Sequence, residues 1–272
     1  MSAAATACAP PLEPGDPLAP GYVVEEHLSR NKVLDVYEVW SAERDCPCVV
    51  KVLRPDCRGH PRRVERLELE GRLLLELAHP HLVRAYEVMR DPELAVVLET
   101  LGGERLDHVI THGARRLPAV EIAELGVQLC SVVGYLHRQG WLHLDLKPTN
   151  VIVDCGIVRL FDLSLVRRPG PGKGRYGTAG WLSPEQERGD AFGAATDAFG
   201  VAAVLFAAAT RRAPCPWQRA AEDDGATTPP RVRSLRRLPG PLAEVIDAGL
   251  QTDPAARPSV RDIGAACAAV AR

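Results

Sequence analysis

Apolar and polar residues alternate along the first part of the chain. Three such runs, YVVEEHL, VYEVWSA and CPCVVKVL, lie between Tyr22 and Leu53 and are separated by polar or proline-containing turns. Alternation with a period of two is typical of half-buried strands, and short turns between such strands favour antiparallel pairing. Two further strands are expected over residues 82–88 and 93–100. The pattern therefore predicts a small antiparallel sheet.

One helix is expected between the third and fourth strands, from about Arg62 to Ala78. Its apolar residues recur at spacings of three and four, and Glu70 lies on the same stripe. The apolar positions are Val64, Leu67, Leu74 and Leu77. His79 and Pro80 end the helix, because the residue before a proline disfavours helical backbone angles.

Beyond Gly102 and Gly103 the periodicity becomes helical. A long helix ending near Gly140 is predicted by Ile122, Leu125, Leu129, Val132, Val133 and Leu136. VIVD at 151–154 and IVRLFD at 157–162 predict a short hairpin, and Ala-rich helices should follow from about Pro184, with loops at 211–240 and 251–258. These elements predict an α+β fold with a flexible tail (residues 1–20), a sheet-rich part (21–101) and a mostly helical part (102–272).

The composition is that of an ordinary globular protein and argues against several function classes. Hydrophobic residues make up 46% and charged residues 25% of the 272 positions, which argues against a disordered or membrane-embedded chain. A net charge of −2 gives no electrostatic footprint for nucleic acid or an anionic membrane. The apolar run at 201–209 is too short to span a bilayer, and residues 1–20 lack the pattern of a signal peptide. We therefore expect a cytoplasmic protein with no nucleic-acid or membrane partner.

The eight cysteines are spread along the chain and form no CxxC pair. Such a distribution is typical of reduced, half-buried thiols. Cys46, Cys48 and Cys57 lie closest together, but their spacing matches no zinc-binding pattern.

Two residue types are scarce in this chain and yet occur close together. Lysine stands only at positions 32, 51, 147 and 173 and asparagine only at 31 and 150, although lysine and arginine together number 33. The segment HLDLKPTN (residues 143–150) contains one of each, beside Asp145. Since arginine would supply the same charge, a lysine at 147 indicates a need for a compact ammonium group on a flexible stem.

The order of three motifs resembles that of the protein kinases. HLDLKPTN at 143–150, FDLS at 161–164 and GTAGWLSPEQ at 177–186 are similar to the catalytic loop, the metal-binding segment and the end of the activation segment of that family. The closest resemblance is to the eukaryotic-type Ser/Thr protein kinases of bacteria, from about Tyr22 to the C-terminus. It implies a bilobal kinase fold, with the sheet and its helix as the N-lobe and the helical part as the C-lobe. It also implies transfer of the γ-phosphate of ATP to Ser/Thr hydroxyls of protein substrates, with Mg²⁺ or Mn²⁺ as the metal ion.

The resemblance assigns a role to each polar residue of these motifs. Asp145 would orient the substrate hydroxyl and accept its proton, and Lys147 would contact the transferring phosphate. Asn150 and Asp162 would be the metal ligands, since Mg²⁺ prefers oxygen. Their separation of twelve residues fits two short strands and a tight turn that bring both oxygens together.

Lys51, within VVKVL, stands where the family has its nucleotide-contacting lysine. A buried ammonium group needs a carboxylate partner, and Glu70 is the expected one, although Glu65, Glu68 and Glu76 are close by. The other residues expected around the nucleotide are Leu28, Val36, Leu98, Glu99 and Leu101.

Three residues are expected to support the site without taking part in the chemistry. Thr178 would hydrogen-bond Asp145, and Asp197 would bind the backbone of the catalytic loop. Glu185 would pair with Arg257 and so tie the activation segment to the C-terminal helices.

The chain departs from the family pattern at its phosphate loop. Ser29, Asn31 and Leu34 stand where the family has three glycines, and no glycine occurs between Tyr22 and Cys57. Since glycine lets backbone amides approach phosphate closely, its loss is expected to loosen nucleotide binding. Asn31 tolerates a left-handed conformation, and Lys32 could contact phosphate directly.

Two departures concern the switch elements. Leu144 replaces the arginine that receives a phosphorylated activation segment in the family, so phosphorylation there is not expected to be the on-switch. DLS at 162–164 replaces the commoner Asp-Phe-Gly, and Ser164 restricts the backbone flip that glycine permits.

Three hypotheses follow for the function. The complete set of chemical residues favours an active Ser/Thr protein kinase. The missing glycines favour a pseudokinase, a nucleotide-binding or scaffold module that acts through a regulated partner protein. A small-molecule kinase of related fold fits less well, because GTAGWLSPEQ resembles a platform for protein substrates. The oligomeric state is left open.

Overall fold

A computed structural model of the chain describes residues 9–172, 174–215 and 228–272. These residues form two compact units. The first runs to Ala78 and resumes over Val83–Leu101, and the second comprises His79–Leu82 and the chain from Gly102 onward. The chain therefore passes from the first unit to the second at its Gly102–Gly103 pair.

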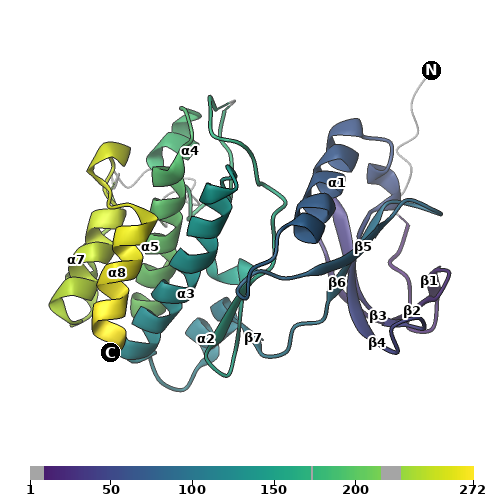
Figure 1. The fold of residues 1–272 in the computed structure, drawn as a ribbon, viewed down its shortest axis with the longest axis horizontal. Helices are drawn as coiled ribbons and strands as arrows, with labels where there is room; N and C mark the ends of the chain where they lie inside the picture. The colour runs from purple at the N-terminus through teal and green to yellow at the C-terminus, as the bar shows by residue number, and fades with distance from the viewer. Residues whose placement is uncertain (1–8, 173, 216–227) are drawn as a thin grey trace. The chain divides into compact units, whose positions relative to one another are not determined.

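The first unit is a curled antiparallel sheet with one long helix packed against it (Figure 1). The strands follow the order β1-β2-β3-β4-β6-β5. They are β1 (Pro17–Ala19), β2 (Tyr22–Arg30), β3 (Leu34–Ser41), β4 (Cys46–Leu53), β5 (Ala85–Met89) and β6 (Ala95–Glu99). The helix α1 (Pro61–Glu76) has proline in its first turn and follows a short 3₁₀ turn, η1 (Pro55–Cys57). The predicted sheet and helix are confirmed.

Alternate side chains of the sheet form an apolar core on one face. Tyr37, Val39, Cys48, Val50 and Val97 are among its buried members. Helix α1 packs closely on β5 and β6 at Gly71. A Cβ atom at this position would lie 2.6 Å from Val88 and 2.7 Å from Val96, which is too close for a side chain. Glycine at position 71 thus allows the close approach that brings the neighbouring Glu70 to the sheet.

The predicted flexible tail (residues 1–20) is wrong from residue 9 onward, and residues 1–8 lie outside the described residues. Strand β1 pairs with β2, and its Leu18 is buried. Upstream, the Leu12 amide donates to the hydroxyl of Tyr37 (3.0 Å). Because β1 is only three residues long, the segment is too short to show an alternating pattern, and its sequence resembles that of a loop.

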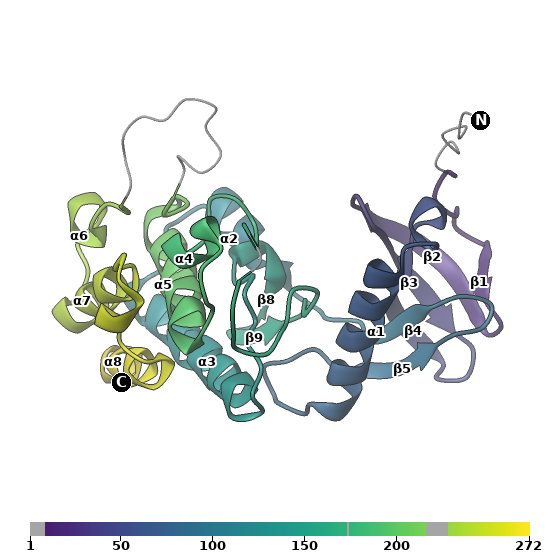
Figure 2. The same ribbon diagram turned by 90° about the horizontal axis from the view of Figure 1, so that it is seen from above.

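The second unit is mostly helical. Its main helices α3, α5, α7 and α8 lie side by side in both views (Figures 1 and 2). The helices are α2 (Leu106–His112), α3 (Ala119–Arg138), α4 (Pro184–Arg188), α5 (Ala194–Thr210), α6 (Val232–Leu235), α7 (Gly240–Gly249) and α8 (Val260–Ala271). A small sheet joins β7 (Glu104–Arg105), β8 (Val151–Asp154) and β9 (Ile157–Leu160), and two 3₁₀ turns, η2 (Pro148–Asn150) and η4 (Pro254–Ala256), complete the unit. The predicted α+β class is confirmed.

Two predicted loops contain short helices. The loop expected at 251–258 includes η4, and the one expected at 211–240 includes the single turn of α6. Residues 216–227 of that loop lie outside the described residues.

Helix α3 is the core helix of this unit. By length and composition alone it could cross a bilayer, and no other helix in the described part of the chain meets that test. It packs against α5 and α8, and its buried residues include Ile122, Leu129, Val133 and Leu136. The apolar run at 201–209 lies within α5, whose side chains are buried over nearly the whole helix. Both apolar segments therefore form the core of the second unit.

A buried ion pair joins the start of α4 to the C-terminal region. Arg257 donates to both carboxylate oxygens of Glu185, at 2.7 and 2.8 Å, and also to the carbonyl of Ala195 at 2.9 Å. Burial acts to raise the pKa of Glu185, but the hydrogen-bonded Arg257 outweighs it, and the pKa is lowered. The pair thus fixes the end of the activation segment to the helical core.

Replacing Arg257 with methionine is expected to lower the free energy of unfolding by about 3–5 kcal/mol, because the Glu185 carboxylate would stay buried without its cation. Urea unfolding followed by circular dichroism measures this. Arg90, whose Nη2 lies 2.6 Å from Glu68 on the exposed surface of the first unit, offers a matched control. Arg90→Met should change the value by less than about 1 kcal/mol. Equal losses in the two variants would contradict the role given to the buried pair.

Candidate active site

The carboxylate of Asp145 lies at the centre of a polar cluster in the second unit. Lys147 Nζ donates to Asp145 Oδ2 at 2.5 Å, and Thr178 Oγ1 donates to Asp145 Oδ1 at 2.7 Å. Lys147 Nζ also donates to Thr178 Oγ1 at 2.7 Å, which closes a triangle of three side chains. Asp145 itself is buried. The cluster thus combines a carboxylate, an ammonium group and a hydroxyl at one point.

Asn150 and Asp162 flank the β8–β9 hairpin, as the sequence predicts. The Asn150 amide nitrogen donates to the Asp145 carbonyl (2.9 Å) and to Asp145 Oδ2 (3.2 Å). The Phe161 amide donates to the Asn150 carbonyl (3.2 Å), so the two ends of the hairpin are adjacent. Asp162 Oδ1 accepts from the Ser164 amide at 3.0 Å. Since both bonds of the Asn150 side chain use its nitrogen, its amide oxygen is turned away from Asp145.

The backbone before Asp145 is held in an unusual conformation. Leu144 has φ 64°, in the left-handed region that a branched side chain rarely adopts. Asp197 Oδ2 and Oδ1 accept from the amides of His143 and Leu144, both at 2.8 Å. Asp197 thus occupies the place under the catalytic loop that the sequence predicts.

His143 is the fully buried residue of this loop. Burial lowers its pKa, so the ring is neutral over the physiological range. Its Nδ1 accepts from the Asp145 amide (3.2 Å), which assigns the ring proton to Nε2. That nitrogen is buried and has no hydrogen-bond partner among the described residues.

A second group of predicted site residues lies in the first unit. Lys51 on β4 and Glu70 on α1 form a buried ion pair with Nζ 2.7 Å from Oε1. The competing candidate Glu68 is instead paired with exposed Arg90. The structure therefore selects Glu70 as the partner of Lys51.

Strand register places two of the predicted nucleotide residues, Val36 and Leu98, on the sheet face that carries Lys51. Val36 is the register partner of Lys51 on β3, and Leu98 is the partner of Val49. Leu28 on β2 is 44% exposed. Glu99 Oε1 accepts from the Arg84 amide, and Leu101 ends the first unit. Val49, two residues before Lys51, has its side chain on the same face, because alternate residues of a strand share a face.

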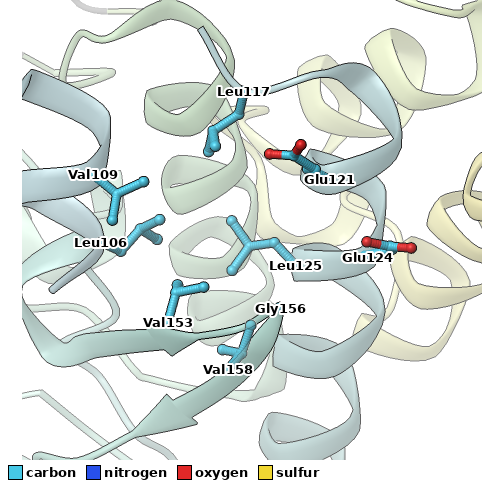
Figure 3. Close-up of a pocket in the computed structure, with 9 residues that line it drawn as sticks. All are labelled: Leu106, Val109, Leu117, Glu121, Glu124, Leu125, Val153, Gly156 and Val158. Atoms are coloured by element: carbon cyan, nitrogen blue, oxygen red, sulfur yellow. The ribbon is translucent and has the colours of Figure 1, made fainter. Parts of the chain in front are cut away.

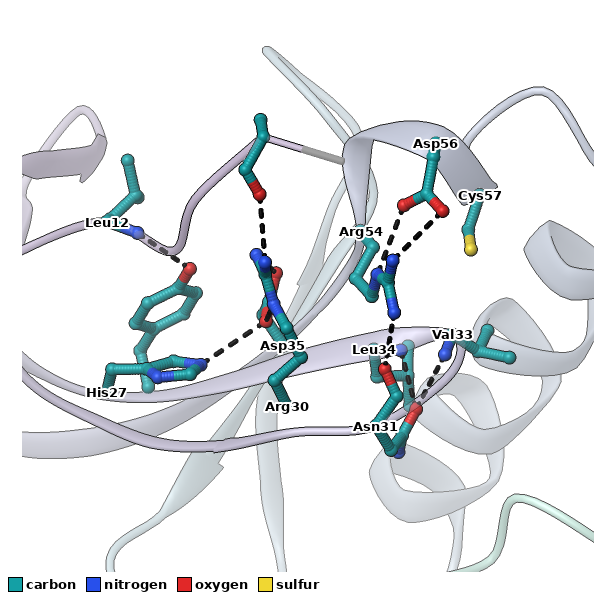
Figure 4. A network of polar contacts seen from close by, with 12 residues as sticks. Leu12, His27, Arg30, Asn31, Val33, Leu34, Asp35, Arg54, Asp56 and Cys57 are labelled. Carbon is teal, nitrogen blue, oxygen red and sulfur yellow. Dashed lines mark hydrogen bonds and ion pairs between the residues drawn. The ribbon is translucent and has the colours of Figure 1, made fainter. Parts of the chain in front are cut away.

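The turn without glycine between β2 and β3 is fixed by side chains (Figure 4). Asn31 Oδ1 accepts from the amides of Val33 (2.7 Å) and Leu34 (2.8 Å), and its carbonyl accepts from Arg54 Nη1 (2.9 Å). Among the described residues 29–36 none has a positive φ, so the left-handed conformation considered for Asn31 is not used.

A second set of contacts holds the strands on either side of this turn. Arg30 binds Asp35 through Nε (2.6 Å) and Nη2 (2.8 Å), and these two residues are also register partners. Arg30 Nη1 donates to the Ala9 carbonyl (2.8 Å), so the N-terminal segment reaches the same place.

Two hollows of the second unit lie apart from these residues. One cavity of about 350 Å³ lies between α2, the first turns of α3 and the β8–β9 hairpin (Figure 3). Leu106, Leu125, Val153 and Val158 line it, with Glu121 and Glu124 on α3. No predicted site residue contributes to it. Within the described part of the chain there is also no group of three or more His, Cys, Asp or Glu side chains that could hold a metal ion.

The fold and the cluster around Asp145 define a domain of the protein-kinase class. The family description "Protein kinase domain" matches residues 22–266, so the chain belongs to this family.

This chain matches only a part of each of the curated relatives. It is 29% identical over 214 residues to the serine/threonine-protein kinase PknB of Mycobacterium leprae, which covers 74% of this chain and 33% of PknB. It is 28% identical over 275 residues to the serine/threonine-protein kinase PkaA of Streptomyces coelicolor, covering 91% of this chain and 49% of PkaA. The chain thus spans about a third to a half of these curated relatives.

Among solved structures, a variant of the PknI kinase domain of Mycobacterium tuberculosis superposes with a TM-score of 0.76. The two are 22% identical, and the match covers 96% of this chain and all of the PknI domain. This likeness concerns the fold.

Replacing Thr178 with valine is expected to lower kcat by about 100-fold, because the hydroxyl that positions both Asp145 and Lys147 is lost. Thr178→Ser keeps the hydroxyl and should retain most of the activity. Steady-state phosphotransfer to a peptide at saturating ATP measures both variants. An unchanged kcat in Thr178→Val would refute the positioning role.

Proposed function

We propose that the chain is a protein kinase that transfers the γ-phosphate of ATP to Ser or Thr hydroxyls of protein substrates. The observation that carries the proposal is the triangle of Asp145, Lys147 and Thr178 next to Asn150. The family and the Ser/Thr kinases among its relatives support it.

Asp145 is proposed to accept the proton of the substrate hydroxyl. As that oxygen bonds to the γ-phosphorus, the bond from this phosphorus to the β–γ bridging oxygen breaks and ADP leaves. Lys147, whose ammonium group lies 2.5 Å from the Asp145 carboxylate, would stabilise the charge on the transferring group. Both groups are held before substrate arrives, so little reorganisation is needed at the moment of transfer.

The chemistry of Asn150 and Asp162 fits Mg²⁺. Both offer hard oxygen donors, and the hydrogen bonds of the Asn150 nitrogen orient its amide oxygen away from Asp145. Mg²⁺ is usually held by one or two protein oxygens together with water and phosphate oxygens, so a larger cluster is not required. Bound there, the ion would neutralise phosphate charge.

In the first unit, Lys51 is proposed to contact the α and β phosphates. The Glu70 carboxylate, 2.7 Å from its ammonium group, holds the lysine charged and aimed. This pair is already formed, which supports an active kinase over the pseudokinase alternative. The free thiols of the seven described cysteines support a reducing, cytoplasmic location.

The proposal predicts that the purified chain gains phosphate when incubated with Mg²⁺ and ATP, or transfers it to a generic basic protein. Intact mass spectrometry detects each addition of phosphate. Asp162→Asn, which removes the negative charge of a proposed metal ligand, should show none. If the wild type also shows none while ATP raises its melting temperature, the chain is a nucleotide-binding pseudokinase.

Loop phosphorylation is predicted not to be the on-switch, because Leu144 offers no charge to receive a phosphate. Treatment with a phosphatase, followed by removal of the phosphatase, should leave the initial rate of substrate phosphorylation unchanged. A lag or a loss of rate that autophosphorylation restores would overturn this prediction.

A further inference from the structure

Gln186 on α4 joins the activation segment to the catalytic loop. Its Nε2 donates to the carbonyls of Leu144 (2.8 Å) and Tyr176 (2.9 Å). Its Oε1 accepts from the amide (3.1 Å) and hydroxyl (3.2 Å) of Ser183. The side chain is buried, and these four contacts use its full capacity as an amide.

The two carbonyls that Gln186 binds lie next to the chemistry. Leu144 directly precedes Asp145, and Tyr176 lies two residues before Thr178, which donates to Asp145. Between them Gly177 has φ 126°, and a Cβ atom there would lie 3.1 Å from Gln186 Nε2 and 3.3 Å from the Leu144 carbonyl. The activation segment therefore passes this amide with no room for a side chain.

The surroundings of this contact are mainly apolar, and one cation, the Arg167 guanidinium, lies over the rings of Tyr176 (5.9 Å) and Phe192 (5.3 Å). Leu144, Leu142 and Phe192 form a buried cluster, and Tyr176 packs against it. The Tyr176 ring stacks on Phe192 with centroids 5.9 Å apart. In the kinases that this chain resembles, an arginine at the position of Leu144 binds a phosphate on the activation segment. Here that position is a leucine, and the buried amide of Gln186 holds the activation segment instead.

We propose that Gln186 is a positioning residue that fixes Thr178 and Asp145 relative to each other, so that the catalytic cluster forms without a phosphate on the activation segment. This inference rests on the proposed kinase function. Gln186 does not touch the reacting atoms and acts through the backbone on either side of the cluster.

Gln186 also belongs to the capping box of α4, and this structural role must be separated from the positioning role. Gln186→Glu makes the separation, because glutamate at this position keeps the acceptor for the Ser183 amide and loses the donor to both carbonyls. A matched control is Gln128→Glu. Gln128 on α3 donates to the Gly156 carbonyl (2.8 Å) and accepts from the Val158 amide (2.9 Å), in a place that contains no predicted site residue.

The expected kcat of Gln186→Glu is roughly 10- to 100-fold below that of the wild type, with KM for ATP nearly unchanged, because the cluster and not the nucleotide contacts is disturbed. The deficit should shrink as pH falls from about 8 to about 6, since a protonated glutamate can again donate to one carbonyl. Gln128→Glu should keep the wild-type kcat at a temperature where both variants are folded. Equal kcat losses in the two variants, or a deficit that does not change with pH, would reduce Gln186 to a structural role.

A second measurement does not depend on turnover. Hydrogen exchange followed by mass spectrometry should show faster exchange over residues 143–146 and 176–178 in Gln186→Glu, and over 156–158 in Gln128→Glu. If the wild type transfers no phosphate, the proposed function fails, and the exchange pattern alone still decides whether Gln186 holds the two segments. Unchanged exchange over 143–146 and 176–178 would overturn the inference.

Discussion

The direction of the catalytic loop depends on the carboxylate of Asp197. A left-handed conformation at a branched residue such as Leu144 costs about 1–3 kcal/mol and persists only when its surroundings enforce it. Asp197 stabilises this conformation, because its two carboxylate oxygens accept hydrogen bonds from the amides of His143 and Leu144, each at 2.8 Å. Since Asp197 lies in the first turn of helix α5, whose residues are buried over nearly its whole length, the position of the loop is tied to the helical core. The orientation of Asp145 is thus set by the helical core.

Three ion pairs at buried residues of the two units define geometry more than they add stability. Lys51 with Glu70, Asp145 with Lys147, and Glu185 with Arg257 each place opposite charges within 2.7 Å or less. Removing such charges from water costs about as much free energy as their attraction returns. Well-packed apolar residues at the same positions would therefore stabilise the fold to a similar extent. The pairs are better explained by the side chains that they orient. Glu70 orients the side chain of Lys51, and Lys147 and Asp145 orient each other. Arg257 holds the start of α4, the helix that contains Gln186.

Hydrophobic periodicity and motif spacing in the sequence predicted the strands, helices and site residues that follow such a pattern. The alternation of the strands, the stripe of α1 and the twelve-residue separation of Asn150 and Asp162 all predicted what the structure contains. The N-terminal segment escaped, because its strand β1 is only three residues long and its contacts further upstream include single hydrogen bonds to Tyr37 and Arg30. Gln186 escaped for a similar reason, since its partners are backbone carbonyls 42 and 10 residues away and any residue type could supply them. Contacts to backbone leave no trace in the sequence of the partner.

The turn at Asn31 shows how the loss of glycine changes the kind of phosphate contact that the first unit can make. A glycine-rich loop binds phosphate through backbone amides that have no other partner. Here the amides of Val33 and Leu34 already donate to Asn31 Oδ1, and the Asn31 amide donates to the Leu34 carbonyl. These amides would have to break existing bonds to reach a nucleotide, so side-chain ammonium groups such as that of Lys51 are left as the main source of positive charge. Arg54 and the Arg30–Asp35 pair hold the turn, and under the proposed function the Lys51 side chain on β4, not the backbone of the turn, would be the main phosphate contact.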